Sequence, residues 1–487
     1  MSKVLVTNGY FYRLDQKQWR FKQPYPPLGT LQAAAVIRQA GFAVSFLDSS
    51  LRDGPEKIEQ ALQKENPDYF VIYDDGFNYL TKMCLTVMRE AVYKMAKLGR
   101  QYGCTVIINS SDSTDHYEKY FEQGVDYVIR GEGERTLEEL LVCLSQKTDV
   151  SQITGLAFRR DGKSIVTSSK AVLRDLDLLP LPAWDLIDLV PYQTIWRNHH
   201  GYFSINVATT RGCPYKCNWC AKPIYGNRYN SRSPEHVIHE IELLLKNYQP
   251  DHFWMCDDIF GLRPGWVANF RNLVKEKNLS FRYKIQSRVD LIVEKDIVQS
   301  LAESGCETVW LGAESGSQKI LDAMDKGTTV EQIREATKLL KHHGIKAAFF
   351  LQFGYPGETK QDIDATLTMV LKEMPDEIGI SVSYPLPGTK FYETVKEQLF
   401  EKQNWTDSDD LAMMYLNTFP QGYYKILQRY VHSRYRIQRG LNRLRDFVNK
   451  PTLYVGDFRK IVSMAYHVPV SLLHAYQLKQ LSPPHGR

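Results

Sequence analysis

The sequence predicts an α/β protein in which a doubly wound parallel sheet is followed by a partial (β/α)6 barrel of the TIM type and a mainly helical C-terminal region. Two observations support this fold class. Apolar strand patterns alternate with helical patterns over residues 1–148, and six further strand-helix units recur over residues 199–400. Residues 149–198 are predicted to connect the two units, and the repeating pattern is absent from residues 401–487.

Composition places the chain among ordinary globular proteins with several domains. Of its 487 residues, 43% are hydrophobic and 24% charged, and the net charge of +5 is too small to indicate a general polyanion binder. The N-terminus lacks the apolar core of a signal peptide, and no stretch approaches the roughly 18 apolar residues of a membrane span. Eight cysteines in a chain of this length do not suggest a disulfide framework. We therefore expect a cytoplasmic protein.

The first unit contains five predicted strands and five predicted helices. The strands are KVLVTNG, FAVSFLDSS, DYFVIYDD, TVIINSS and DYVIRG, and the helices are LGTLQAAAVIRQAG, PEKIEQALQKE, LTKMCLTVMREAVYKMAKLGRQYG, STDHYEKYFEQG and ERTLEELLVCL. Sheets of this kind bind ligands outside the carboxyl ends of their strands. Asp74, Ser110 and Ser111 follow two of those strands and are therefore candidate binding residues.

Two short segments of the first unit stand out, PPLG at residues 26–29 and RGEGERT at residues 130–136. Gly131 and Gly133 would let the backbone approach a ligand, and the helix that follows would favour an anion or acceptor at its N-terminus. RGEGERT could equally be a tight turn that caps a helix. It is not a dinucleotide fingerprint, because Thr136 stands where the third glycine should be.

The connector begins with a predicted hairpin around Asp161 and Gly162. The stretch LRDLDLLPLPAWDLIDLVPY follows, and its density of Leu and Pro argues against a single regular element.

The middle unit repeats a strand and a helix about six times. The strands are FSINVATT, DHFWMCDD, FRYKIQSRV, TVWLGAES, KAAFFLQFG and EIGISVSYPLPG, and the helices include SPEHVIHEIELLLKNY, EKDIVQSLAESG, TVEQIREATKLLKHHG and KQDIDATLTMVLKEM. Barrel active sites gather at the carboxyl ends of the strands, so the residues at each strand exit are the candidates for a site.

The stretch TRGCPYKCNWC follows the first of these strands and places Cys213, Cys217 and Cys220 in a C-x3-C-x2-C spacing. Three thiolates on one loop can hold three corners of a metal site. A structural zinc site needs four protein ligands, whereas a [4Fe–4S] cluster held by three cysteines leaves one iron open to a small molecule. We favour the cluster and keep zinc as the alternative, with Cys256 as its remote fourth ligand. The other cysteines are expected to be core thiols.

Polar or turn residues follow the other strand exits of the middle unit. Each one taken alone could be a helix cap, a surface charge or an ordinary turn. Their shared position around the cysteine loop instead indicates one site. The set comprises Asp258, Gln286, Arg288, Glu314, Ser315, Tyr355, Pro356 and Gly357.

With these motifs in view, the stretch from Lys3 to Leu399 resembles the cobalamin-binding branch of the radical S-adenosylmethionine (SAM) superfamily, which includes the anaerobic Mg-protoporphyrin cyclase type. The cysteine motif with its aromatic neighbour carries the resemblance to the superfamily. The branch is indicated by PPLG, RGEGERT, LPLPAWDL, WLGAESGS, FGYPGET and PLPGTKFYE, which occur in that order.

The resemblance implies cofactors and residue roles in the middle unit. Cys213, Cys217 and Cys220 would ligate a [4Fe–4S] cluster, whose open iron would chelate SAM. Trp219 would pack near the adenine. Arg288 and Glu314 would contact the methionyl or ribose moieties, and Tyr355, Pro356 and Gly357 the adenine. Asp258, Gln286 and Ser315 are further candidates for cofactor contacts at the neighbouring strand exits.

The first unit would bind cobalamin. The residues expected to contribute are Pro27, Leu28, Gly29, Asp74, Ser110, Ser111, Gly131, Glu132, Gly133 and Thr136. Some cobalamin proteins carry D-x-H-x-x-G, whose histidine binds cobalt. The loop NGYFYRLDQKQW after the first strand contains no histidine. We therefore expect no histidine ligand on cobalt.

The resemblance also implies a reaction. An electron supplied by a donor such as flavodoxin or ferredoxin would cleave SAM to methionine and a 5′-deoxyadenosyl radical, which would abstract hydrogen from an unactivated carbon. We favour C-methylation of a small molecule or natural product. The alternatives are a radical cyclase or ring-rearranging enzyme without methyl transfer and, less favoured, an RNA-modifying enzyme or a zinc-stabilised nucleic-acid-binding protein. A nucleic-acid partner is not expected.

The C-terminal region is strongly basic. Between Gln421 and Lys450, eight Lys or Arg stand against one Asp, with four tyrosines interleaved. The pattern favours a basic helix that packs its aromatic residues on the barrel. Recognition of RNA or an anionic substrate, or a lid over the substrate, are the alternatives.

Overall fold

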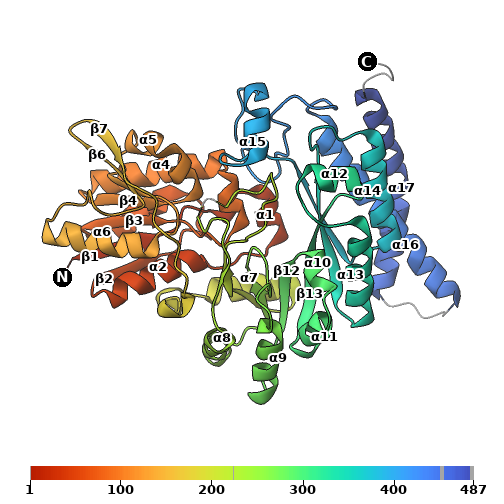
Figure 1. The fold of residues 1–487 in the computed structure, drawn as a ribbon, viewed down its shortest axis with the longest axis horizontal. Helices are drawn as coiled ribbons and strands as arrows, with labels where there is room; N and C mark the ends of the chain where they lie inside the picture. The colour runs from red at the N-terminus through yellow and green to blue at the C-terminus, as the bar shows by residue number, and fades with distance from the viewer. Residues whose placement is uncertain (1, 223, 450–454, 483–487) are drawn as a thin grey trace.

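The computed structural model describes residues 2–222, 224–449 and 455–482. Three parts follow one another along its long axis (Figure 1). The N-terminal sheet and its helices form one end, a parallel half-barrel lies in the middle, and two long C-terminal helices form the opposite end. This is the predicted fold class.

The N-terminal sheet is doubly wound, as predicted. Its strands run in the order β2-β1-β3-β4-β5-β6-β7, and the first five are parallel. The chain order reverses between β1 and β3, which is the switch point at which such sheets bind ligands. The strands are β1 (Lys3–Thr7), β2 (Ala43–Leu47), β3 (Tyr69–Tyr73), β4 (Thr105–Asn109) and β5 (Tyr127–Ile129).

Helices cover both faces of this sheet because successive residues of each strand point to opposite sides. Val4, Val6 and Val71 pack in one buried cluster, whereas Leu5 and Ile72 belong to the other. The helices are α1 (Gln16–Phe21), α2 (Leu28–Gln39), α3 (Ile58–Glu65), α4 (Thr86–Gln101), α5 (Ser111–Phe121) and α6 (Glu134–Gln146), with short 3₁₀ turns η1 (Tyr12–Leu14) and η2 (Pro55–Lys57).

One predicted helix is divided in two. The helical pattern predicted from Leu80 to Gly103 is a 3₁₀ helix, η3 (Tyr79–Met83), followed by α4, and Cys84 between them has a left-handed φ of 52°. The backbone N–H of Thr86 donates to the carbonyl of Trp405 at 3.0 Å. This contact with a segment more than 300 residues away in the sequence leaves no trace in local periodicity, so the sequence prediction was wrong here.

The connector begins as an extension of the N-terminal sheet. The predicted hairpin forms strands β6 (Leu156–Arg160) and β7 (Lys163–Val166), and β6 pairs antiparallel with β5. Asp161 and Gly162 both have positive φ, as a two-residue hairpin loop requires. Two 3₁₀ turns, η4 (Leu176–Leu178) and η5 (Trp184–Leu186), and helix α7 (Val190–His200) complete the connector.

The predicted partial barrel is a six-stranded, fully parallel sheet in the order β15-β14-β13-β12-β11-β8. Its strands are β8 (Ser204–Val207), β11 (His252–Met255), β12 (Arg282–Ser287), β13 (Cys306–Glu314), β14 (Lys346–Phe353) and β15 (Glu377–Val382). A two-stranded ribbon, β9 (Thr210–Arg211) with β10 (Asn230–Ser231), flanks the cysteine loop.

The helices of the half-barrel lie on its outer side (Figure 1). They are α8 (Pro234–Tyr248), α9 (Trp266–Glu276), α10 (Val289–Ile292), α11 (Ile297–Glu303), α12 (Gln318–Ala323), α13 (Val330–His342) and α14 (Lys360–Glu373). Side chains of Ser233, Thr329 and Thr359 accept from backbone N–H groups at the starts of α8, α13 and α14. These caps satisfy donors that a helix cannot satisfy itself.

The C-terminal region starts with α15 (Lys390–Val395), the turn η6 (Lys396–Gln398) and an irregular segment, and ends in α16 (Tyr423–Asn449) and α17 (Val455–Leu481). The buried tyrosines 423, 424 and 435 of α16 face the barrel, and the hydroxyl of Tyr435 donates to the carbonyls of Pro375 and Asp376 at 2.6 and 2.7 Å. The basic helix therefore packs its aromatic residues on the barrel, as the sequence favoured. Within the described residues, no helix is long and apolar enough to cross a membrane.

Trp184 joins the connector to the half-barrel. Its indole N–H donates to Glu240 on α8 at 2.9 Å, and Glu240, which is 0% exposed, also pairs with Arg232 at 2.5 Å. Replacing Glu240 by Gln should lower the free energy of unfolding by about 3 kcal/mol, because Arg232 would stay buried without a counter-charge. Urea unfolding measures the loss. The control Glu235→Gln, at an exposed position of the same helix, should change stability by less than about 0.5 kcal/mol.

Candidate cofactor site

The cysteine loop leaves the carboxyl end of β8, at the predicted position. Asp257, which follows β11, accepts from the backbone N–H groups of Thr209 and Thr210, each at 2.7 Å. Gly212 has a φ of 76°, and a Cβ at this position would lie 2.3 Å from the carbonyl oxygen of Arg228. Only glycine fits this entry to the loop.

The exit of β14 reaches the same loop. The hydroxyl of Tyr355 donates to Asn218 Oδ1 at 3.0 Å and to the carbonyl of Ala323 at 2.9 Å. The backbone N–H of Asn218 donates to the carbonyl of Met324 at 3.0 Å. These bonds connect the exit of β14 to Asn218, the residue before Trp219 in the cysteine loop.

An ion triad joins the cysteine loop to the N-terminal domain. Arg211, two residues before Cys213, pairs with Glu132 at 2.5 Å and with Glu134 at 2.7 Å. The side chains of Arg211, Glu132 and Glu134 are 6%, 10% and 2% exposed, so the triad is buried. The ring of Tyr225 lies 5.1 Å from the guanidinium carbon. Glu132 is one of the residues predicted to contact cobalamin, and in the structure its carboxylate binds Arg211 and accepts from the backbone N–H of Leu173.

The thiols of the loop are free and partly buried. Burial raises the pKa of the Cys213 thiol, and it raises the pKa of Cys220 to about 11. The ammonium groups of Lys222 and Lys82 act against this increase at Cys220. They would favour thiolates, which are the form that binds metal.

Two more cations face Cys217. The guanidinium of Arg288, at the exit of β12, lies 3.9 Å from Cys217 Sγ and 3.7 Å from the ring centroid of Tyr215. The ammonium of Lys326 is buried and pairs with Glu314 at 2.8 Å. Burial acts to lower the pKa of Lys326, but Glu314 and the nearby Cys217 outweigh it, and the pKa is raised.

The remaining predicted residues of the half-barrel contact different parts of the protein. Asp258 pairs with Lys82 of the N-terminal domain at 2.5 Å. Ser315 is turned to Thr366 on α14, 3.1 Å away. Gln286 is half-buried in β12, and Pro356 and Gly357 lie in the turn after β14. The carbonyl of Gly357 accepts from Lys319.

The PPLG segment lies against the half-barrel. Pro26 accepts from the Asn206 side chain of β8 at 3.0 Å, and Gly29 donates its N–H to Asp75 at 2.9 Å. Pro27 precedes α2 as its N-cap residue, and Leu28 is buried.

Internal packing accounts for the second glycine of RGEGERT. A Cβ at Gly133 would lie 2.9 Å from the ring of Tyr73 and 3.0 Å from Asn109. The carbonyl of Gly131 accepts from the Asn109 amide at 3.0 Å, and the Thr136 hydroxyl donates to the carbonyl of Thr154.

The carboxyl edge of the N-terminal sheet carries polar groups with a hydrogen-bond partner and others without one. Asp74 accepts from the N–H of Gly9 at 3.2 Å, and burial raises its pKa to about 7. Ser110 caps α5 in a capping box with Ser113. The Ser111 hydroxyl and the Nε of Arg130 are buried without a hydrogen-bond partner. The indole N–H of Trp219 in the cysteine loop is also buried without a hydrogen-bond partner. Such groups are rare and call for a ligand or water.

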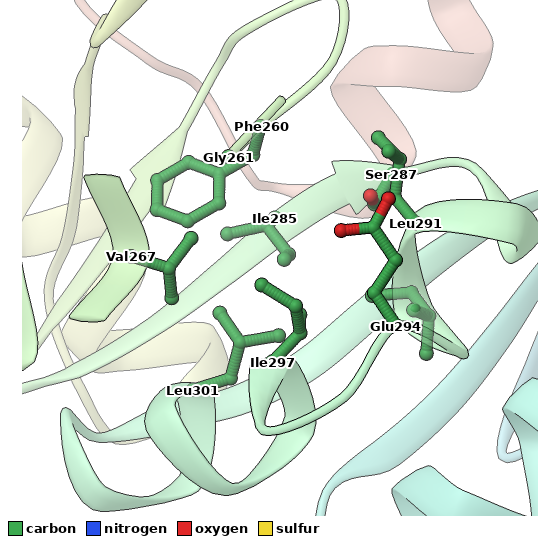
Figure 2. A pocket seen from close by; sticks show the side chains of 10 residues that line it. Phe260, Gly261, Val267, Ile285, Ser287, Leu291, Glu294, Ile297 and Leu301 are labelled. Atoms are coloured by element: carbon green, nitrogen blue, oxygen red, sulfur yellow. The ribbon is translucent and has the colours of Figure 1, made fainter. Parts of the chain in front are cut away.

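Two small pockets are distinct from the cysteine loop. Figure 2 shows one between β12 and helices α9 and α11, where Ile285, Val267 and Leu301 converge with Glu294 at one side. None of the predicted site residues lines it. The other pocket lies at the domain seam and is lined by Leu28 and Arg211, among others.

Comparisons with known proteins agree with this division of the chain. Residues 207–370 match the model of the radical SAM superfamily, and residues 20–141 match that of the B12 binding domain. The chain contains a radical SAM domain and a B12-binding domain.

Relatives of this radical SAM protein include enzymes of two types. It is 29% identical to an uncharacterised methyltransferase of Pyrococcus horikoshii, over 78% of this chain and 81% of the relative. It is 26% identical to the anaerobic magnesium-protoporphyrin IX monomethyl ester cyclase of Synechocystis, over 77% and 74%. Its fold is similar to that of OxsB, a cobalamin-dependent SAM radical enzyme solved with aqua-cobalamin and SAM bound, with a TM-score of 0.73, 16% identity and coverage of 98% and 72%.

The described residues contain no group of three or more His, Cys, Asp or Glu that could hold a single metal ion. The ligands of a single ion converge on one point, whereas each cysteine of an iron–sulfur cluster binds a different iron atom. A single metal ion would therefore require the three thiols to point at one atom, whereas an iron–sulfur cluster would require each thiol to reach a different iron atom.

Sequence reasoning missed Lys82, Arg211 and Lys326. Arg211 lies two residues before Cys213, and this position was a usable signal. Lys82 and Lys326 do not directly follow a predicted strand, and their sequence context carries no signal.

Replacing Arg211 by Gln should lower the free energy of unfolding by about 3 kcal/mol, because two carboxylates would stay buried without their cation. It should also make the seam between the N-terminal domain and the cysteine loop more open to proteases. Urea unfolding and limited proteolysis measure the two effects. Arg228→Gln, at an exposed position close to the loop, is the matched control. Equal stability of the two variants would contradict the structural role of the triad.

Proposed function

We propose that this protein is a cobalamin-dependent radical SAM enzyme that methylates an unactivated carbon of a small molecule. The observation that carries the proposal is a loop with three free thiols, faced by Lys82, Lys222, Arg288 and Lys326, at the seam with a B12-binding domain. When bound, the cluster and SAM supply a 5′-deoxyadenosyl radical, and cobalamin supplies a methyl group. An electron donor such as flavodoxin or ferredoxin is part of the proposal.

The residues present fit these groups. Three thiolates are the donor set of a cluster with one open iron, and the surrounding cations would stabilise their negative charge. Cys213, Cys217 and Cys220 would hold the cluster. The unpaired indole N–H of Trp219 could donate to SAM, and the Ser111 hydroxyl and Arg130 to cobalamin.

The protein's own contribution is to orient these groups and exclude water. Arg288 is held in two directions, by Asp290 at 3.0 Å and by the ring of Tyr215. Glu314 has a left-handed φ of 56°, which is uncommon for a residue other than glycine, and its salt bridge with Lys326 fixes its side chain. We propose that Arg288 and Glu314 contact the methionyl and ribose parts of SAM, beside Tyr355.

A cyclase or ring-rearranging activity is the second candidate, favoured by the similarity to the magnesium-protoporphyrin cyclase. A SAM labelled with deuterium in its methyl group separates the two. Transfer of the label to the product, with two SAM consumed per turnover, supports methylation. A product without the label, with cobalamin still required, supports the cyclase type.

Replacing Cys213, Cys217 and Cys220 by Ala should abolish iron uptake on anaerobic reconstitution and the formation of 5′-deoxyadenosine under reducing conditions. The matched control is Cys143→Ala, which removes a half-buried thiol outside the loop. It should retain iron uptake and the formation of 5′-deoxyadenosine. Iron and sulfide content, the visible spectrum and chromatography of the nucleoside are the measurements. Zinc without iron in anaerobically purified protein, or 5′-deoxyadenosine from the triple variant, would overturn the assignment.

Replacing Lys326 by Met should weaken SAM binding to the reconstituted protein by about tenfold or more, because Glu314 would lose the buried partner that orients it. Equilibrium dialysis with labelled SAM measures the dissociation constant. Lys326→Arg should recover part of the affinity, and the exposed Lys338→Met on α13 should have no effect. Unchanged binding in Lys326→Met, with iron content preserved, would exclude this role of Lys326.

A further inference from the structure

Helix α17 presents its apolar side outward. The side chains of Val462, Tyr466, Val468, Leu472, Leu473 and Tyr476 are 44–69% exposed. At 3.6 residues per turn their positions fall on one broad face of the helix over several turns. We call these six residues the α17 outer face. From Ile461 to Leu478 the sequence contains no Lys, Arg, Asp or Glu.

The side of α17 that packs on the protein is the more polar one. In the described part of α17 the buried residues are His467, Ser471 and Leu478, at 8%, 5% and 8% exposed, and His467 lies 2.9 Å from Arg436 of α16. Close packing at Gly440, where a Cβ would lie 2.4 Å from Met464, holds the two helices together. A surface helix normally has the opposite arrangement, with its apolar face toward the core. Exposed patches of this kind mark interaction sites.

The charge around the outer face is positive. Helices α16 and α17 contain ten Lys or Arg and two Asp, a larger excess than the +5 of the whole chain. Arg459 and Lys479, both exposed, bound the outer face at its two ends. The remainder of the chain is therefore net acidic, and the basic character is concentrated at the end of the molecule opposite the N-terminal sheet (Figure 1).

This charge distribution decides between possible occupants. In a pair of α17 helices from two copies of the chain, an antiparallel arrangement would place Arg459 opposite Lys479, and a parallel one would place each opposite itself. Both bring like charges together. An anionic lipid surface instead offers apolar chains to the outer face and negative headgroups to its basic ends.

We propose that the α17 outer face binds anionic membranes, with its six apolar side chains in the acyl boundary and Arg459 and Lys479 at the headgroups. The helix lies in the plane of the interface and does not cross the bilayer. The proposal is independent of the cofactors and of the reaction proposed above, because it rests on a surface remote from the cysteine loop.

Cosedimentation of the full-length protein with vesicles tests the proposal. The protein should bind vesicles of one part phosphatidylglycerol to three parts phosphatidylcholine, and bind phosphatidylcholine alone much less. The double variant Leu472→Ser/Leu473→Ser should lower the partition coefficient about tenfold or more, because two exposed leucines no longer enter the apolar layer. The matched control is Leu178→Ser/Leu416→Ser, which removes two leucines that are 61% and 65% exposed elsewhere. It should bind as the wild type does.

Several outcomes would overturn the proposal. The wild-type protein could remain in the supernatant, or both double variants could bind equally well. Binding lost in Arg459→Gln/Lys479→Gln but kept in the leucine variant would indicate a general polyanion surface, such as one for RNA. Sedimentation velocity without lipid adds the last test. A wild-type dimer that becomes a monomer in Leu472→Ser/Leu473→Ser would assign the face to a second copy of the chain.

Discussion

The buried triad of Arg211 with Glu132 and Glu134 fixes the position of the cysteine loop relative to the N-terminal domain. Arg211 belongs to the short strand that enters the loop, Glu132 lies in the turn after β5, and Glu134 is the first residue of α6. A buried ion pair adds little net stability, since desolvation offsets most of the attraction, but it strongly penalises any arrangement that leaves one charge unpaired. The triad therefore selects one placement of the two domains. The loop that is proposed to hold the cluster cannot move away from the sheet that is proposed to hold cobalamin without exposing or isolating these charges.

The same principle organises the charges around the thiols. Lys326 is paired with Glu314, Lys82 with Asp258 and Arg288 with Asp290. Each of these three cations thus has a carboxylate partner that keeps it in place, whereas Lys222 is held by the carbonyl of Tyr215 and the side-chain oxygen of Asn227. While the thiols are neutral, the positive and negative charges of these pairs cancel. When the thiols become thiolates, the cations that stabilise them are already oriented. Lys82 contributes from the N-terminal domain, and it can do so because the chain breaks its helix at Cys84.

Sequence patterns sufficed for the parts of the fold that depend on local periodicity. The alternation of strands and helices predicted both parallel sheets, and the rule that sites gather at strand exits placed Arg288, Glu314 and Tyr355 around the cysteine loop. The prediction failed where long-range contacts decide. Leu80 to Gly103 had a continuous helical pattern, yet the helix is divided at Cys84, next to a hydrogen bond between Thr86 and Trp405. Lys326 had no local signal, because its role arises only when its segment lies against the cysteine loop.

A half-barrel has two free edge strands, and the way in which they are covered explains the placement of the other parts of the chain. An uncovered edge would offer unpaired backbone groups to other chains. The N-terminal domain covers the edge at β8, where Pro26 accepts from Asn206 and Tyr25 meets Ser204. Helix α16 covers the other edge at β15, where the hydroxyl of Tyr435 donates to the backbone. The first cover places the N-terminal sheet next to the strand that leads into the cysteine loop. The second attaches α16 at the opposite edge of the half-barrel, and α17 packs on α16, so the apolar outer face of α17 stays exposed.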